Sequence, residues 1–297
     1  MRTSFCLIGA RLVSARILGA AALIGIAGAA GAAPIMALTD FTGACGSILV
    51  CAGDAAEAGG VLRLVPAARE QAGAAWLATA VPLSATTGFV SSFSFRLGAG
   101  EAMRADGLAF VVARDPSSLG DPSRYGGSMG FEGVGDSLAV EFDTFDNGDE
   151  GSDNHVALAR DGVLGNLASA SPYGVAACAA APDAAGCFAN GNIWTAIVTY
   201  DGAAQHLSVV VRDGDAAMDL VIGGYAVNLR AVVGGDTAWL GFAAGTGDGM
   251  MDHDLLGWSL STMTMSNAAA TAVPEPAGLA LLGTALAGLA ATRRRRF

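Results

Sequence analysis

A series of short apolar segments separated by turns is the feature that most constrains how this chain can fold. Several of them alternate apolar and polar residues, most clearly Phe89-Val90-Ser91-Ser92-Phe93-Ser94-Phe95, as expected for a strand with one buried face. No segment has a convincing amphipathic helical pattern. We therefore predict an all-β fold, a β-sandwich, with strands over residues 61–65, 74–83, 89–97, 108–113, 138–144, 194–200, 207–211, 220–227, 238–244 and 255–264.

The first residues have the pattern of an export signal. Arg2, Arg11 and Arg16 precede an apolar run over 17–30, and Ala30-Gly31-Ala32-Ala33 supplies the small residues of a cleavage site. We predict a signal peptide over residues 1–32; an N-terminal membrane anchor is the alternative reading.

The C-terminal residues form a second signal with three parts. Pro274, Glu275 and Pro276 are followed by an apolar segment over 277–291 and by the basic cluster 293–296. The apolar segment is shorter than the about 20 residues of a stable membrane span, and the arginines would stay on the cytoplasmic side. A tail-anchored membrane protein is one reading of this pattern.

This end also resembles the Pro-Glu-Pro C-terminal sorting signal (PEP-CTERM) of Gram-negative bacteria that secrete exopolysaccharide. The resemblance implies that an exosortase-type enzyme processes residues 273–297 after export through the inner membrane. The protein would then reside at the cell surface or in the extracellular matrix. Residues 266–272 would be a linker between this signal and the folded domain.

Charge limits the classes of partner. The chain has no lysine, and seven of its 16 basic residues lie in the two terminal signals, whereas nearly all 27 acidic residues lie between them. A strongly acidic mature region makes nucleic acid an unsuitable partner and favours cations or neutral polymers.

The cysteines predict disulfides in an exported chain. Cys6 falls in the signal, and the other four form two close pairs, Cys45 with Cys51 and Cys178 with Cys187. We predict these two local disulfides, although the sequence leaves the other two connectivities open. The second pair would pin an Ala- and Gly-rich surface insertion over 161–191.

The stretch from Glu141 to His155 is rich in possible metal ligands, with six carboxylates, two Asn and one His. As a strand, its first half would bury Phe142 and turn Glu141, Asp143 and Asn147 to the other face. Carboxylates side by side on one face repel each other unless a cation lies between them. Oxygen donors suit calcium and an imidazole suits a transition metal, which predicts a metal site; a solvated acidic loop is the alternative.

Four motifs in order resemble the L-type lectins, the legume-lectin-like jelly-roll family that includes bacterial members. They are Ala105-Asp106-Gly107-Leu108-Ala109-Phe110, Gly126-Gly127-Ser128-Met129-Gly130-Phe131, Val140-Glu141-Phe142-Asp143-Thr144-Phe145 with Asn147 and His155, and Gly241-Phe242-Ala243-Ala244-Gly245-Thr246-Gly247 followed by His253-Asp254-Leu255-Leu256-Gly257-Trp258-Ser259. The resemblance implies a legume-lectin-like jelly-roll β-sandwich over residues 33–265.

The resemblance also implies the residues of a sugar site. Asp106, the backbone amide of Gly127 and Asn147 would hold the sugar, Phe145 would stack on its apolar face, and Gly247, Asp248 and Gly249 would form a specificity loop. The chemistry is suitable, because a carboxylate, an amide and a backbone N–H offer the acceptor and donors that a sugar hydroxyl needs.

For metals, the resemblance implies that Asp143 bridges two ions. Glu141 and His155 would complete a transition-metal site, such as one for manganese, while the Phe145 carbonyl and Asn147 would bind calcium. The family usually has an Asp five residues before the His, where this chain has Glu150 preceded by Asp149. This departure leaves open whether one metal binds or two. The peptide between Ala105 and Asp106 would be cis if the metal site forms.

These expectations favour a secreted or surface-associated, calcium-dependent lectin that is not an enzyme and that binds exopolysaccharide or surface glycans. A homodimer is compatible with the resemblance. One alternative is a non-catalytic matrix or adhesion protein without sugar binding. A less favoured one is a jelly-roll glycoside hydrolase, because Glu141-Phe142-Asp143-Thr144-Phe145-Asp146 is similar to the Glu-x-Asp-x-x-Glu motif of laminarinase-type enzymes. In a regular strand, however, Glu141 and Asp146 would lie on opposite faces.

Overall fold

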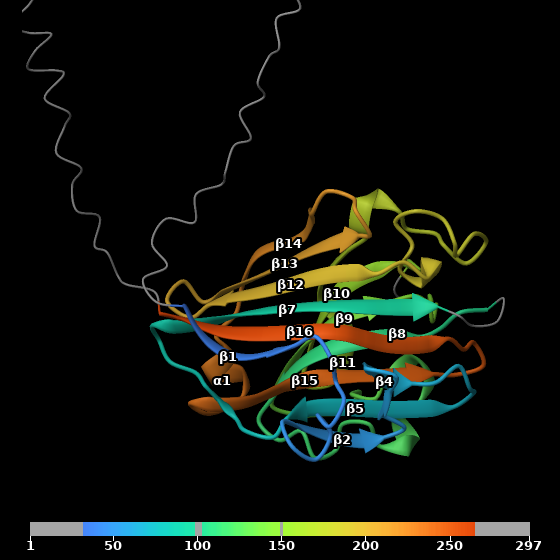
Figure 1. Ribbon diagram of the computed structural model, residues 1–297. Helices are drawn as coiled ribbons and strands as arrows, with labels where there is room; N and C mark the ends of the chain where they lie inside the picture. The colour runs from blue at the N-terminus through green and yellow to red at the C-terminus, as the bar shows by residue number, and fades with distance from the viewer. Residues whose placement is uncertain (1–31, 99–102, 149–150, 265–297) are drawn as a thin grey trace, which may run out of the picture.

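The computed structural model describes residues 32–98, 103–148 and 151–264, which form two antiparallel sheets packed face to face (Figure 1). The sheet that carries both ends of the acidic stretch, Glu141–Asp143 and His155, is called the front sheet and the other the back sheet. The back sheet has the order β14 (Asp219–Ala226), β13 (His206–Asp213), β12 (Trp194–Asp201), β7 (Thr87–Gly98), β16 (Asp252–Thr264), β4 (Val61–Val65) and β3 (Ala56–Ala58), and β1 (Ala32–Leu38) also pairs with β16. The front sheet has the order β11 (Val163–Ala170), β10 (His155–Arg160), β9 (Ser137–Asp143), β8 (Gly107–Ala113), β15 (Thr237–Thr246), β5 (Gln71–Leu77) and β2 (Leu49–Gly53), with β6 (Val81–Pro82) on β15.

Helical structure in the described ranges is limited to single turns. These are α1 (Leu229–Val232) and the 3₁₀ helices η1 (Pro122–Arg124), η2 (Gly126–Ser128), η3 (Pro172–Gly174) and η4 (Phe188–Asn190). Within 32–98, 103–148 and 151–264, no helix has the length and apolarity needed to cross a membrane. The signal peptide, the linker and the sorting signal with its apolar segment 277–291 lie outside the described residues.

The main core lies between the sheets and follows from the period-two alternation. Phe93 of β7 packs edge-on against Phe242 of β15, with ring centroids 4.8 Å apart, and also contacts Phe110 and Phe142 of the front sheet. Burying one such side chain stabilises the fold by roughly 1.5–3 kcal/mol. The predicted all-β sandwich is confirmed, since aromatic residues at alternate positions of both sheets meet in one core.

A second, smaller apolar cluster covers the outer face of the front sheet. Ala109, Ala139 and Ala243 leave room on this face for Met129 and Phe131, which come from the loop between β8 and β9. This loop therefore lies over the front sheet and brings η2, which contains Gly127, toward the end of the sheet.

The predicted surface insertion over 161–191 is wrong in its first half. Residues 163–170 form β11, which pairs with β10 and extends the front sheet. Asp161 and Gly162 both have positive φ, 54° and 70°, and form the two-residue turn between Arg160 and Val163. Such a turn matches the twist of a hairpin. Gly165, Asn166, Ala168 and Ala170, which are half of β11, are residue types depleted in strands, which is why the pattern concealed this strand.

Both predicted disulfides are confirmed, Cys45 with Cys51 and Cys178 with Cys187. Cys51 lies in β2 at one edge of the front sheet, and the second disulfide closes the segment that follows β11, the strand at the other edge. We call one end of the sandwich the loop end, where β7 ends and β16 begins, and the other the terminal end, where β7 begins and β16 finishes beside the start of β1. The loop end lies on the right of Figure 1 and the terminal end on the left.

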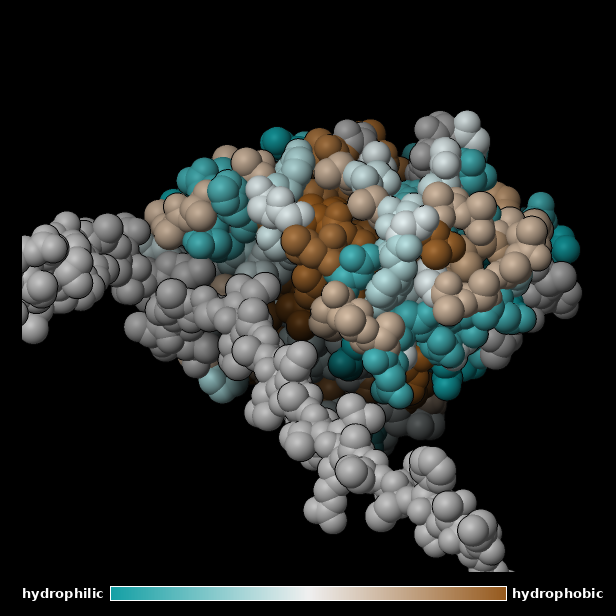
Figure 2. All heavy atoms as spheres, turned by 90° about the horizontal axis from the view of Figure 1, so that it is seen from above, coloured by the Kyte–Doolittle hydropathy of each residue, from teal (hydrophilic) through white to brown (hydrophobic). Residues whose placement is uncertain are grey.

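The edge of the back sheet is partly apolar. Figure 2 shows the molecule from the β14 side of Figure 1, with apolar side chains gathered near the middle of the view between more polar regions. β14 is the edge strand here, its pairing with β13 is irregular, and it exposes Leu220. Irregular pairing blunts an edge strand as a template for another chain.

Candidate functional site

Asp106 lies at the loop end, just before β8, and is the most unusual polar residue there. Its peptide with Ala105 is cis, as the resemblance implies. Its backbone is fixed from both sides: its N–H donates to the Gly245 carbonyl at 3.1 Å, and its carbonyl accepts from the backbone N–H and the Oγ1 of Thr144 at 2.9 and 3.0 Å. The residue is only 4% exposed.

The Asp106 carboxyl has few hydrogen-bond donors around it to compensate for its burial. Burial raises its pKa to about 7, and only the backbone N–H of Gly247 opposes this shift. Oδ2 is buried and accepts no hydrogen bond from the described residues. A buried acceptor without a donor is costly, so a ligand hydroxyl that reaches this oxygen would gain a strong hydrogen bond.

Gly127 and Asn147 are neighbours, although they lie in different loops. A Cβ placed on Gly127 would lie 2.7 Å from Asn147 Nδ2, so glycine permits this approach without a shift of the Asn147 side chain. Gly126, next in sequence, lies close to both Asp106 and Gly247. The structure thus brings Asp106, Gly127, Asn147 and Gly247 together at one end of the front sheet, from four separate segments.

The predicted specificity loop borders this group. Gly249 lies against Ala105 and Met103, and the Met250 N–H donates to the Met103 carbonyl at 3.1 Å. Asp248, in contrast, extends into solvent with a side chain 82% exposed and forms an ion pair with Arg69 at 2.9 Å. The backbone of this loop, more than its carboxylate, is placed beside Asp106.

Phe145 follows β9 and is half-buried, and its N–H donates to Asp143 Oδ1 at 2.7 Å. Its ring lines a cavity of about 250 Å³ between the end of β9 and the segment closed by the second disulfide. Phe145 therefore connects the group around Asp106 with a second hollow at the loop end.

The structure describes some of the predicted metal ligands and not others. Asp143 and His155 are both buried and face each other across β9 and β10, and Gly107 is the partner of Asp143 on the other side. The carboxylate of Glu141 is also fully buried and accepts from the Gly165 N–H at 3.1 and 3.2 Å. Asp149 and Glu150 lie outside the described residues.

Within residues 32–98, 103–148 and 151–264, no three His, Cys, Asp or Glu side chains are grouped so as to hold a metal ion. Individual donors nevertheless fit the expected ions. Nδ1 of His155 lies 3.0 Å from the Ser152 carbonyl, and it must be the donor because a carbonyl only accepts. Burial lowers the pKa of His155, so its neutral form carries the lone pair on Nε2, the tautomer that metal-binding histidines use. Asp143 and Asn147 offer the hard oxygens that calcium prefers.

The carboxylates of the glycosidase-like motif are in different environments. Glu141 is fully buried, whereas Asp146 is exposed beyond the end of β9, where it accepts from the Gly148 N–H at 2.8 Å. A retaining glycosidase needs two carboxylates that face one bond of the substrate. This arrangement does not fit such a pair.

Three residues of the loop end were not among the predicted site residues. Thr144 fixes the Asp106 carbonyl, and its place in the motif Val140–Phe145 was the available signal. Asn154 is fully buried and holds the segment of the second disulfide. Arg104 lines the cavity beside Phe145, and its position directly before the cis peptide was the only sequence signal.

Comparison with known proteins gives the class of protein that this fold and site define. Residues 37–275 match the model of the legume lectin domain, and residues 272–296 match the PEP-CTERM protein-sorting motif. The chain therefore belongs to the legume lectin family, whose domain is a carbohydrate-binding and non-enzymatic module. The sorting motif indicates export and sorting to the bacterial cell surface.

Relatives agree with this assignment. A lectin of Leucomphalos mildbraedii is 27% identical over 192 residues, which cover 61% of this chain and 72% of that protein. Among solved structures, the Bauhinia forficata lectin in complex with GalNAc has a TM-score of 0.62 at 21% identity, covering 79% of this chain and 99% of that one. Peanut lectin has a TM-score of 0.64 at 22% identity, with 78% and 98% covered. At these identities the structural matches support the fold alone.

Proposed function

We propose that this protein is a calcium-dependent lectin that acts outside the cell on exopolysaccharide or surface glycans. The observation that carries the proposal is the convergence of Asp106, Gly127, Asn147 and Gly247, with a buried carboxylate oxygen that accepts no hydrogen bond within the described part of the chain. These groups give the mixture of acceptors and donors that orients a sugar hydroxyl.

In this proposal the sugar lies over the loop end of the front sheet. Asp106 accepts from one hydroxyl or two, the Gly127 N–H and the Asn147 amide donate, and Phe145 packs on the apolar face of the ring. The backbone of residues 247–249 limits which hydroxyls fit. The protein would therefore bind its ligand without turnover, in keeping with the different environments of Glu141 and Asp146.

Calcium would be held by Asp143, Asn147, the Phe145 carbonyl and one of Asp149 or Glu150. When bound, it fixes Asn147 and its loop, so that less conformational entropy is lost when the sugar arrives. Glu141 and His155 would hold a second metal such as manganese. The Glu141 carboxylate would have to exchange its contact with the Gly165 N–H for that metal.

The ends of the chain fit a protein that presents glycan-binding sites away from the cell. The strands that lead to the termini finish at the terminal end, and the proposed sugar site lies at the loop end. A signal peptide over 1–32 and processing by an exosortase at Pro274-Glu275-Pro276 would place the domain 33–265 on the cell surface or in its matrix.

Titration calorimetry of the calcium-loaded protein with a panel of monosaccharides, repeated with chelator, tests the proposal. Heat of binding that disappears with chelator, without product release, is the expected result. Asp106→Ala should abolish sugar binding and leave calcium uptake intact, and Asp236→Ala at the terminal end is the matched control. Calcium uptake without binding to any glycan would instead favour a matrix protein, and product release would favour a glycosidase.

A further inference from the structure

The segment from Ser171 to Gly191 forms a rigid wall beside the proposed sugar site. Asn154 donates to the Val175 and Gly186 carbonyls, both at 2.9 Å, and accepts from the Phe188 N–H at 2.8 Å. Asp153 accepts from the N–H groups of residues 178 and 179 at 2.5 and 2.7 Å. The disulfide and these contacts fix the wall to the residues that directly precede His155.

The cavity between this wall and Phe145 has the size and chemistry of a sugar subsite. It encloses about 250 Å³ and is lined mainly by apolar atoms, from residues that include Met103, Phe145 and Pro182. Sugar-binding hollows commonly combine an apolar surface for the ring with a few polar groups for its hydroxyls. Phe145 belongs to both the cavity and the proposed primary site, so the two are neighbours that share this residue.

Arg104 supplies the polar group of this cavity. Its Nη1 donates to Asp183 at 2.7 Å and to the Ala189 carbonyl at 2.5 Å, and its side chain is 17% exposed. Its Nε is buried and has no acceptor in the described part of the chain. A guanidinium with an unused N–H is suited to donate to a hydroxyl oxygen that enters beside it.

The charges around the cavity favour an uncharged ligand. The positive charge of Arg104 is balanced by Asp183 outside the cavity, and Asp153 places a carboxylate in the lining itself. A sugar that carries a carboxylate would meet net negative charge there, in a protein that is already acidic.

We propose that this cavity is a second subsite, which binds the neighbouring uncharged sugar of a glycan whose first sugar is held at Asp106. The inference rests on the proposed lectin function and deepens it, because it makes the ligand a neutral oligosaccharide or polysaccharide. Arg104 donates to the second sugar, and Phe145 and Pro182 contact its ring.

The test uses the calcium-loaded protein and the methyl glycosides of glucose, galactose and mannose, each with its neutral α- and β-linked disaccharides. For the preferred sugar, at least one disaccharide should bind about tenfold more tightly than the methyl glycoside. Arg104→Gln should remove most of this gain and change monosaccharide affinity less than twofold. Arg230→Gln, which also removes an arginine–carboxylate pair but at the terminal end, should change neither affinity.

A second variant tests the cavity without touching Arg104. Ala179 lines the cavity and is exposed, so Ala179→Phe should fill the space without disturbing the fold, and should also remove the gain. Equal affinity for every disaccharide and its methyl glycoside would overturn the subsite and leave the lectin function standing. Absence of any sugar binding would overturn both, and tighter binding of a disaccharide of galacturonic acid would overturn the assignment of an uncharged ligand.

Discussion

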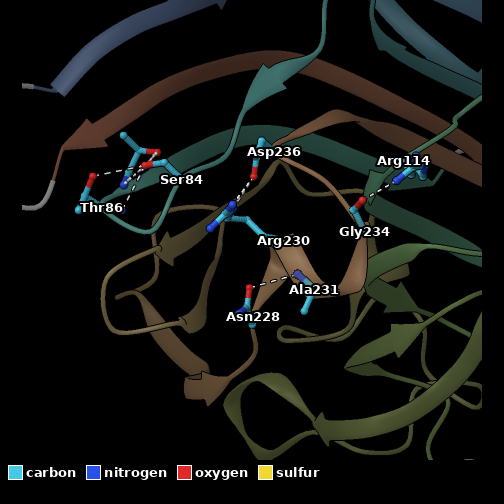
Figure 3. A network of polar contacts seen from close by, with 9 residues as sticks. Ser84, Thr86, Arg114, Asn228, Arg230, Ala231, Gly234 and Asp236 are labelled. Atoms are coloured by element: carbon cyan, nitrogen blue, oxygen red, sulfur yellow. Dashed lines mark hydrogen bonds and ion pairs between the residues drawn. The ribbon is translucent and has the colours of Figure 1, made fainter.

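The two ends of the sandwich differ in whether their polar groups have hydrogen-bond or ion-pair partners. At the loop end, Asp106 Oδ2, Arg104 Nε and His253 Nε2 are buried and have no hydrogen-bond partner among the described residues. At the terminal end, the corresponding groups are paired (Figure 3): Arg230 binds Asp236, and Asn228 caps α1 by accepting from the Ala231 N–H at 3.2 Å.

The other polar groups of the network at the terminal end are also paired. Arg114 donates to the carbonyls of Val233 and Gly234 at 3.3 and 2.6 Å, and Ser84 Oγ accepts from the N–H groups of Thr86 and Thr87. These contacts close turns between strands and stabilise the fold locally. The comparison teaches that the polar groups at the terminal end are paired within the fold, whereas three at the loop end are buried without a partner in the described part of the chain, at a cost in stability.

The largest expected effect is at Asp106. Asp106→Asn should weaken sugar binding by about 100-fold, or about 3 kcal/mol, because the amide turns one of the two acceptor oxygens of the carboxylate into a donor. In calcium-free buffer at pH 8 the same variant should be at least as stable as the wild type, because it removes a charge that burial disfavours. Calorimetry and urea unfolding measure the two quantities. A variant that binds normally, or one that is clearly destabilised, would contradict the comparison.

His253 should make stability depend on pH. Burial lowers its pKa from 6.5 to about 4, against smaller opposite effects of the Met251 carbonyl and Asp254. The unfolded chain therefore binds this proton first as pH falls. The stability that neutral His253 contributes is present above pH 6.5 and is lost between pH 6.5 and 4, by at most about 3 kcal/mol.

The measurement is the unfolding free energy of the wild type minus that of His253→Gln, followed from pH 7 to pH 4. Subtraction removes the titration of the groups that do not interact with His253. Asp254, which does interact with it, is paired with Arg63 and Arg96. A difference that does not change over this window would show that His253 is not buried in its neutral form.

Both disulfides should contribute to stability, but only the second should contribute to disaccharide binding. Each closes a short loop, so replacing either pair with serines should lower the free energy of unfolding by about 2–3 kcal/mol. Only Cys178→Ser with Cys187→Ser should also weaken disaccharide binding, because only that segment walls the cavity. Urea unfolding and calorimetry of both double variants check this, and an equal loss of binding in the Cys45 and Cys51 variant would remove the distinction.

The smallest effect is expected at the terminal end. Arg230→Gln should lower the free energy of unfolding by less than about 1 kcal/mol, because its ion pair with Asp236 is largely exposed to solvent. A double-mutant cycle with Asp236→Asn measures the coupling between them. Sugar affinity should stay at the wild-type value throughout the cycle.

Much of the fold could be predicted because strands with one buried face must alternate apolar and polar residues. β7 and β12 were predicted almost to their bounds for this reason. β11 was missed because half of its residues, Gly165, Asn166, Ala168 and Ala170, are of types depleted in strands, and its place in the sheet depends on pairing with β10 and on the turn at Asp161 and Gly162. This hairpin is local in sequence, but its backbone pairing is not encoded in the propensity of single residues.

The candidate site likewise has a part that the sequence predicted and a part that only the structure revealed. Motif order alone pointed to Asp106, Gly127 and Asn147, but their proximity arises only when the loop between β8 and β9 lies over the front sheet. Arg104 and the cavity had no pattern of their own, because a cavity is defined by segments that are distant in sequence.

The sequence by itself determined the all-β class, the family and the acidic character of this protein, and it favoured the two local disulfides. Each of these is recorded in periodicity, motif order, spacing or composition. Only the tertiary structure decided that Asp106 is buried with an unsatisfied oxygen, that Glu141 turns to the Gly165 N–H, and that the disulfide segment walls a cavity beside Phe145. The physical reason is that burial and hydrogen bonding depend on which distant segments pack together, and a pattern along one strand does not specify its neighbours.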